Sequence, residues 1–376
     1  MLRAKKLVKD YVEDEVIPYC KRNSPLPLLR LEYTGSMYEG LKCEAADEAD
    51  LMVVLDTTDL EVVLEDVSEV PGYAKIKEDI NSTPLRRYVD PWGYIIPAQI
   101  RLAWFYSLVT KAKNAFELKL PLSPVCLRVS SHGPAVKLDI ILDATGAKKT
   151  LLSVDLVLCF QIGSSDYYVA KPYEGRRPVS DAELLWRPSF SLREKKVLKK
   201  IDKEDGCRRE LLRIVKTILK KETTFAGLTS YHLKTAFMHY MTDTTENWSG
   251  DRSLEEHFPG FLGKLQSYLT DRQLPNYWQP RMNLLKDLNQ KVLEHMASRL
   301  AKMKVCSKMC TGCVFSELVP LRGQKRNFKP RPQNRILVPL KDSFQNFQRT
   351  PPSFFIWELP RGLVSCSALN AESSLS

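Results

Sequence analysis

The sequence predicts a two-lobed α+β protein, in which a lobe built on a mixed sheet precedes a helical lobe. Three observations predict this architecture: apolar runs of strand length lie in the first half, apolar residues recur at helical spacing from about Ser191 onward, and 44% of the 376 residues are hydrophobic. That fraction can bury a large core, and the length suits one large domain or two ordinary ones. Strands followed by helices indicate two lobes of different construction.

The first half opens with a helix and continues with strands. Apolar residues of Leu2–Val16 recur near helical spacing, so we expect an amphipathic helix that ends near Pro18. The apolar run Leu51–Leu55 predicts a buried strand, and Leu60–Val70 predicts another strand with a bend. The periodic segment Ala98–Ala115 predicts a second helix.

A β-hairpin follows. Its predicted arms are Ala135–Leu142 and Thr150–Phe160, joined by a turn over residues 143–149. The second arm, TLLSVDLVLCF, is apolar apart from Ser153 and Asp155. A lone acid in so apolar a strand is costly unless it meets a cation.

The second half is helical up to about Lys304. One apolar stripe is formed by Leu211, Leu212, Val215, Ile218 and Leu219, and others lie in Tyr231–Tyr240, Phe261–Leu269 and Leu284–Met303. Beyond Lys304 the chain is rich in proline, asparagine, glutamine and basic residues without periodicity, which is typical of disorder.

Charge and cysteine content bound the function classes. The net charge of +11 favours a polyanionic partner such as nucleic acid, although an ordinary basic protein has the same balance. No apolar run approaches the roughly 20 residues that cross a bilayer, and the charged N-terminus has no apolar signal core. Nine cysteines in such a chain indicate reduced thiols and a cytoplasmic location, with the nucleus as a further option.

Three carboxylates form the strongest chemical signal. Glu48 and Asp50 precede the strand Leu51–Leu55 and project to the same side, because strand side chains alternate. Asp155 can add a third ligand from a neighbouring strand, and such an acidic set can hold two divalent cations for phosphoryl transfer. The Gly35-Ser36 turn offers a close backbone approach to a phosphate. Each feature alone is common in solvated loops; their order along the chain is the specific signal.

That order resembles the nucleotidyltransferase fold, and in detail the Mab-21 family, closest to the cyclic GMP-AMP synthase-like receptors. The resemblance spans roughly residues 1–305 and is carried by four stretches: TGSMYEGLKCEAADEADLMVVLD (34–56), GPAV followed by LLSVDLVLCF (133–160), LLWRPSFSLREK (184–195) and LTSYHLKTAFMHYM (228–241). It implies a catalytic lobe with an N-terminal spine helix over residues 1–183, a helical C-terminal lobe over 184–304 and a disordered tail over 305–376.

The resemblance also implies the site residues. The catalytic and metal-binding triad, for Mg²⁺ or Mn²⁺, falls on Glu48, Asp50 and Asp155. Asp139, in VKLDII, is the alternative third acid, but it lies in the preceding arm and we expect a surface or hairpin position for it. The implied nucleotide contacts are Thr34, Ser36, Glu48, Asp155, Arg187, Ser189, Ser191, Glu194, Lys216, Ser230 and Tyr231.

We expect structural roles for four residues of the same motifs. Trp186 and Phe190 have the spacing of core aromatic residues, and His232 and His239 are expected to form structural hydrogen bonds.

The implied activity is a pyrophosphate-releasing transferase that makes a cyclic dinucleotide, such as 2′,3′-cyclic GMP-AMP, from ATP and GTP. The product would be a second messenger in innate immunity, read by a STING-type receptor. One alternative is a non-catalytic Mab-21 protein that binds nucleotide or acts as a scaffold. A second is an oligoadenylate-type synthase with linear products, which shares the metal site but not the SYHLKTAF context.

The resemblance departs at the zinc-binding insertion of the vertebrate enzymes. Residues 199–221 contain Cys207 but no histidine, so we expect no zinc site, which needs four ligands. The segment is nevertheless basic, which suits a phosphate-backbone surface or merely a solvated face. We expect double-stranded RNA as activator, bound by Lys195, Lys196, Lys199, Lys200, Arg208 and Arg209.

A further cysteine motif does not indicate a cluster. Cys306, Cys310 and Cys313 have the C-x3-C-x2-C spacing of some iron–sulfur ligands, but they follow the last predicted helix and precede the tail. We therefore expect no iron–sulfur cluster there.

Overall fold

The computed structural model describes residues 1–43, 45–57, 62–78, 84–144, 147–171, 173, 178–201, 206–249 and 253–309. The chain divides into two compact units, Met1–Pro320 and Leu321–Ser376, and all described residues belong to the first. Most of the segment for which the sequence predicts disorder, 305–376, lies outside the described residues. In the described part, no helix is both long and apolar enough to cross a membrane.

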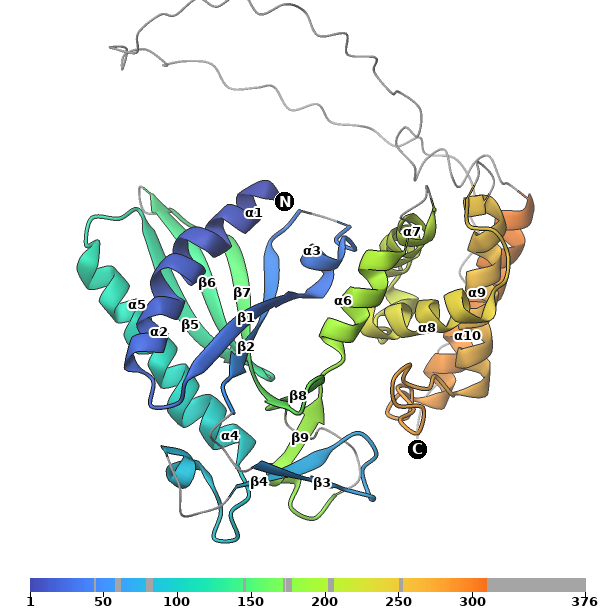
Figure 1. Cartoon of the computed structure of the whole chain (residues 1–376). Coiled ribbons are helices and arrows are strands. Elements are labelled where there is room, and N and C mark those ends of the chain that lie inside the picture. The colour runs from blue at the N-terminus through green and yellow to red at the C-terminus, as the bar shows by residue number, and fades with distance from the viewer. Residues whose placement is uncertain are drawn as a thin grey trace, which may run out of the picture. The chain divides into compact units, whose positions relative to one another are not determined.

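A mixed sheet forms the first lobe (Figure 1). Its spatial order is β1-β2-β7-β8-β9-β4-β3, and the hairpin β5-β6 joins through β7. Strands β2 and β7 run parallel, whereas the other pairs are antiparallel. The strands are β1 Leu28–Thr34, β2 Glu48–Leu55, β3 Val62–Asp66, β4 Ala74–Glu78, β5 Val125–His132, β6 Ala135–Ala144, β7 Ala147–Ile162, β8 Asp166–Val169 and β9 Leu185–Pro188.

Two long helical rods cover one face of this sheet (Figure 1). The first comprises α1 Leu2–Leu7, a π-helical segment Val8–Val16 and α2 Ile17–Asn23. The second comprises α4 Pro97–Gln99, a π-helical segment Ile100–Tyr106 and α5 Ser107–Lys119. The rods contact each other through Tyr11 and Phe116, whose ring centroids lie 5.8 Å apart.

The expected helix end near Pro18 is wrong. Pro18 lies inside a continuous helical rod: the π-helical segment Val8–Val16 leads directly into α2, which runs on to Asn23. The predicted hairpin is confirmed, but its turn is shorter than expected because β6 runs to Ala144 and β7 begins at Ala147. The short strands β4, β8 and β9 were not predicted.

The second lobe has its own core, in which Phe237 and Phe261 are fully buried. Its helices are α6 Ser191–Lys200, α7 Arg208–Lys221, α8 Ser230–Asp243, α9 Ser253–Asp271 and α10 Gln290–Met309. One short 3-10 turn lies at Thr223–Phe225, and two others precede this lobe in the chain, at Pro84–Tyr88 and Ala182–Leu184. The predicted α7 stripe is confirmed. Helix α10 starts later than expected, because the side-chain oxygen Oδ1 of Asn283 accepts from the Leu274 and Leu285 amides and holds a turn there.

Candidate metal and nucleotide site

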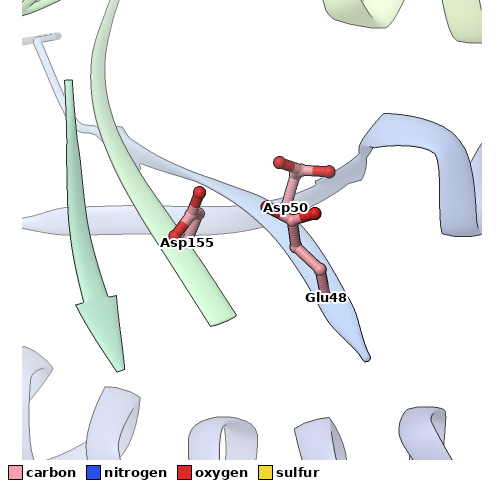
Figure 2. Close-up of side chains that lie close together, drawn as sticks. All are labelled: Glu48, Asp50 and Asp155. Carbon is pink, nitrogen blue, oxygen red and sulfur yellow. The ribbon is translucent and has the colours of Figure 1, made fainter. Parts of the chain in front are cut away.

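Three acids meet at one edge of adjacent strands. The β2–β7 register places Asp50 beside Asp155, and the β1–β2 register places Thr34 on the other side of Asp50. Each of Glu48, Asp50 and Asp155 offers a carboxylate oxygen within 4.8 Å of the others (Figure 2). The structure thus brings together the three acids that the sequence singled out.

The acids destabilise one another's charge. Burial, followed by the charges of Glu48 and Asp155, raises the pKa of Asp50 to about 7. Burial and then Glu48 also raise the pKa of Asp155. Within the described part of the chain, Asp155 Oδ1 is buried and has no hydrogen-bond partner. A proton or a cation at this position would relieve the repulsion.

The donor set fits a hard divalent cation. All three groups are carboxylates, which suit Mg²⁺ and Mn²⁺, and the orphaned Asp155 oxygen is available as a ligand. Helix α3 (Gly35–Glu39) begins against this cluster. Gly35 has φ +73°, and a Cβ there would lie 1.7 Å from Asp50 Oδ2, so only glycine permits the approach.

Of the two positions expected for Asp139, the hairpin position is confirmed and the surface position is wrong. Its side chain is buried, forms an ion pair with Arg128 at 2.7 Å and accepts a hydrogen bond from Ser153 Oγ at 2.6 Å. Although burial opposes ionisation, the bonds from Ser153 and Arg128 keep the pKa of Asp139 below its usual value. Asp139 is therefore satisfied within the β5–β6–β7 hairpins.

A first cavity of about 600 Å³ contains five of the expected nucleotide contacts. These are Arg187, Ser189, Ser191, Glu194 and Tyr231. Burial and then the Glu194 charge raise the pKa of Tyr231 to about 12, so its hydroxyl stays neutral. The cavity is thus lined by a cation, hydroxyls and an aromatic ring, a set that can bind a nucleotide.

Sequence reasoning missed other residues of this cavity. They include Tyr73, Tyr173, Asn283 and Lys286. The two tyrosine rings meet edge to face at 5.5 Å, and the Lys286 ammonium lies 5.9 Å from the Tyr173 ring centroid. These residues come from irregular segments, where a single tyrosine, asparagine or lysine is only a weak signal.

A second cavity of about 480 Å³ adjoins the acid cluster through Glu48. It contains the expected residues Ser36, Lys216 and Ser230. Ser230 and Tyr231 open helix α8 and line different cavities, so this helix end lies between the two. The second cavity is also lined by residues that sequence reasoning did not select: Lys42, Cys43, Lys220 and Lys221.

Some expected residues are engaged within the protein. Thr34 is buried, and its hydroxyl donates to the Asp50 carbonyl oxygen at 3.3 Å. Trp186 is fully buried, as predicted, and its indole N–H donates to the Ile95 carbonyl oxygen. The core prediction for Phe190 is wrong, because Phe190 lines the first cavity and stacks near Trp278, with centroids 6.4 Å apart.

A buried ion network joins the lobes. Lys234 of α8 contacts Glu39 of α3 at 3.1 Å and Glu194 of α6 at 2.5 Å, and both glutamate side chains are at most 2% exposed. Although burial disfavours its ammonium, Glu194 and Glu39 raise the pKa of Lys234. The second oxygen of Glu194 is buried without a hydrogen-bond partner among the described residues.

The basic candidates divide into two groups. Lys196, Lys199 and Lys200 are exposed on α6. In contrast, Lys195 lies over the Tyr33 ring at 5.9 Å, Arg208 lies over the Trp248 ring at 4.9 Å, and Arg209 donates to the Leu198 carbonyl oxygen at 3.0 Å. The exposed α6 lysines are thus the best placed to meet a phosphate backbone.

The remaining residues have structural positions. His232 and His239 form hydrogen bonds to the carbonyl oxygens of Leu284 and Pro275, as predicted. Cys207 is buried and accepts from Ser253 Oγ. Cys310 and Cys313 of the cysteine motif lie outside the described residues.

Comparison with known proteins agrees with this geometry. Residues 37–200 match the Mab-21 protein nucleotidyltransferase domain, and residues 207–302 match the Mab-21 protein HhH/H2TH-like domain. Cyclic GMP-AMP synthase-like receptor 3 of Stylophora pistillata is 48% identical over 307 residues, which cover 80% of this chain and 88% of that protein. A cyclic GMP-AMP synthase-like receptor of Nicrophorus vespilloides is 28% identical over 72% of this chain and 77% of its own length.

The vertebrate enzyme is a more distant relative. Cyclic GMP-AMP synthase of Sus scrofa is 27% identical over 71% of this chain and 60% of its own length. The acid cluster, the two cavities and these matches lead to one assignment: the chain belongs to the Mab-21 family of nucleotidyltransferase-fold proteins, in the group of cyclic GMP-AMP synthase-like receptors.

Proposed function

We propose that this protein joins ATP and GTP into a cyclic dinucleotide, such as 2′,3′-cyclic GMP-AMP, when a nucleic acid activates it. The observation that carries the proposal is the cluster of Glu48, Asp50 and Asp155, with a pKa of about 7 at Asp50 and an orphaned oxygen on Asp155 in the described structure. A purely structural site would have no reason to keep three repelling acids together.

The three acids would hold two Mg²⁺ or Mn²⁺ ions. Such ions neutralise the charge that develops on the attacking and leaving oxygens of a phosphoryl transfer. A ribose hydroxyl of one nucleotide attacks the α-phosphorus of the other. The new P–O bond replaces the bond to the β-phosphate, whose electrons leave with pyrophosphate. Asp155 takes the hydroxyl proton and passes it to water.

The two cavities support two bound nucleotides. Ser36, Lys216 and Ser230 in the second cavity would bind the donor triphosphate, and Arg187, Ser189, Ser191 and Glu194 in the first would position the acceptor. Tyr231 would stack on a base. A second round of transfer in the same pocket would close the ring.

Double-stranded RNA is the activator that we propose. The exposed lysines of α6 offer charge without an evident set of base-reading groups, which suits recognition of RNA by its shape and phosphates. We place the protein in the cytoplasm and its product upstream of a STING-type receptor. We also propose that residues 199–221 hold no zinc ion.

A nucleotide-product assay tests the function. Full-length protein is incubated with the four labelled nucleoside triphosphates and Mg²⁺ or Mn²⁺, without nucleic acid, with double-stranded DNA or with double-stranded RNA. We expect a phosphatase-resistant product only with RNA and none from Asp50→Asn/Asp155→Asn. A linear product would favour the oligoadenylate-type reaction. Folded protein that binds nucleotide but makes no product under any condition would favour the scaffold role.

A further inference from the structure

The second cavity has a cationic side that the proposed nucleotide contacts do not explain. Its polar lining includes Ser36, Lys42, Glu48, Lys216, Lys220 and Ser230. Glu48 also belongs to the acid cluster, so the cavity begins where a metal-bound phosphate would lie. Gathering lysines around a cavity is unfavourable unless an anion enters, because like charges repel.

Lys42 lines this cavity and forms an ion pair with the exposed residue Asp47. Its side chain is 14% exposed, and its Nζ lies 2.7 Å from Asp47 Oδ1 and 3.9 Å from Glu48 Oε2. The Asp47 side chain is 73% exposed. Because one partner lies in water, the pair contributes little to stability, and a stronger anion can displace Asp47.

Lys216 adds a second ammonium group to the lining of this cavity. Its ammonium donates to the neutral Leu41 carbonyl oxygen at 3.2 Å. Burial is the first cause that lowers the pKa of Lys216, and the charges of Lys234 and Lys42 add to it. Lys42 and Lys216 both line this cavity, so one polyanion inside it can meet both ammonium groups.

We propose that Lys42 is a leaving-group residue, whose ammonium binds the β- and γ-phosphates of the donor nucleotide and holds the departing pyrophosphate. Asp47 occupies the same ammonium until the phosphates arrive. This inference rests on the proposed function, since it concerns the same reaction. The proposed role of Lys42, between α3 and β2, is to bind phosphate and not the base or the ribose.

The charge balance explains the need for this residue. When the bond between the α-phosphorus and the bridging oxygen breaks, its electron pair stays on that oxygen and the pyrophosphate gains one negative charge. A nearby ammonium neutralises this charge without moving a proton. A cation held by Glu48 would offset the charge of that carboxylate, which lies 3.9 Å from the Lys42 ammonium, and would leave Lys42 to the phosphates.

Calorimetric binding of inorganic pyrophosphate with Mn²⁺ to the full-length protein tests the proposal without requiring turnover. We expect Lys42→Met to weaken binding by roughly tenfold or more, the loss of one charge-assisted contact. Lys42→Arg should keep most of the affinity. Asp47→Asn should tighten binding by about two- to fourfold, because it removes the competitor for Lys42.

Lys75 supplies a matched control. Its side chain is 18% exposed and pairs at 2.6 Å with Asp181, which is 51% exposed, yet it lines neither cavity. Lys75→Met should bind pyrophosphate like the wild type. Melting temperatures of all variants show whether a loss of affinity reflects unfolding. The expected gain of affinity in Asp47→Asn cannot result from misfolding.

Kinetics provide a second readout. In the product assay, Lys42→Met should lower kcat more than it raises KM for the donor, because the charge develops as the bond breaks. Wild-type affinity for pyrophosphate in Lys42→Met, or no binding to the wild type, would overturn the proposal. If binding depends on Lys42 but no cyclic product is ever formed, the proposed function fails while the pyrophosphate subsite stands.

Discussion

The backbone of Gly35 lies directly against the carboxylate of Asp50. A Cβ at Gly35 would stand 1.7 Å from Asp50 Oδ2, and the residue has φ +73°. Both the space and the backbone conformation therefore demand glycine. The first turn of α3 and the acid on β2 form one unit, in which the position of each depends on the other.

Gly35→Ala should separate catalysis from folding. The methyl group must push Asp50 away from Glu48 and Asp155, so we expect a loss of at least about a hundredfold in product formation, as for other small displacements of catalytic groups. The Mn²⁺-induced rise in melting temperature should also disappear. Gly40→Ala is the matched control: Gly40 also has positive φ, +76°, but its nearest neighbour for a Cβ is Arg209 Cδ at 3.9 Å. If Gly35→Ala keeps full activity, the clash is not the constraint.

Asp50→Asn should stabilise the metal-free protein at high pH. A folded-state pKa of about 7 against an ordinary 3.8 means that the protonated carboxyl favours folding. This contribution is complete below about pH 4 and is lost as the pH rises through 7. The loss is on the order of 4 kcal/mol, at about 1.4 kcal/mol per unit. Asparagine at position 50 avoids this loss because its side chain does not ionise.

Thermal unfolding in EDTA at pH 5 and pH 8 measures this effect. The melting temperature of Asp50→Asn should exceed that of the wild type by several degrees at pH 8 and by less at pH 5. Added Mn²⁺ should raise the wild type and leave the variant almost unchanged. Asp143→Asn, at the exposed end of β6, serves as control. An equal difference at both pH values would contradict the assigned pKa.

Lys234→Met should be strongly destabilising. It leaves Glu39 and Glu194 buried without their cation, which costs about 3–5 kcal/mol. Urea unfolding should show the cost at pH 7.5, and the cost should shrink as the pH falls, because burial raises the pKa of Glu39 and its carboxyl takes up a proton. Glu39→Gln in the same chain should restore part of the stability.

An exposed lysine pair sets the scale for this measurement. Lys264 contacts Asp243 at 2.8 Å, with side chains 33% and 52% exposed. Lys264→Met should cost less than about 1 kcal/mol. Similar losses for the two lysine variants would mean that the buried network is not a specific stabiliser of the lobes.

Replacing the exposed α6 lysines should weaken RNA binding without altering sequence preference. We expect Lys196→Ala/Lys199→Ala/Lys200→Ala to reduce the slope of log affinity against log salt by about two to three, since each phosphate contact contributes about 0.7–0.9. Fluorescence anisotropy with double-stranded RNA at several salt concentrations measures it. A triple alanine variant of other exposed lysines, Lys21, Lys111 and Lys149, should keep the wild-type slope. Equal slopes in all three proteins would place the RNA elsewhere.

The acids of the site could be found from the sequence because local rules determine their placement. Glu48 and Asp50 share a strand face by alternation, and Asp155 stands out in an apolar strand. Asp139 fulfils the same rule, and the sequence left open a surface or a hairpin position for it, whereas it is buried in the hairpin. Its compensating cation, Arg128, lies opposite it on β5, and cross-strand pairing is not visible in one sequence.

The long-range parts could not be predicted. Strands β8 and β9 have four residues each and acquire their conformation from neighbouring strands rather than from their own pattern. Lys234 is one lysine in a helical pattern, and its partners lie on α3 and α6. The cavity residues Tyr73 and Asn283 come from irregular segments, where side-chain type alone carries little information.

The parallel pairing of β2 with β7 also has a consequence for synthesis of the chain. Asp50 and Asp155 become neighbours only when β7 has joined β2, and the intervening helical rod and hairpin are made first. A parallel pair of such sequence separation closes slowly compared with local structure. A nascent chain still within β6 therefore has two of the three acids, so the ribosome must finish most of the first lobe before the proposed metal site can exist.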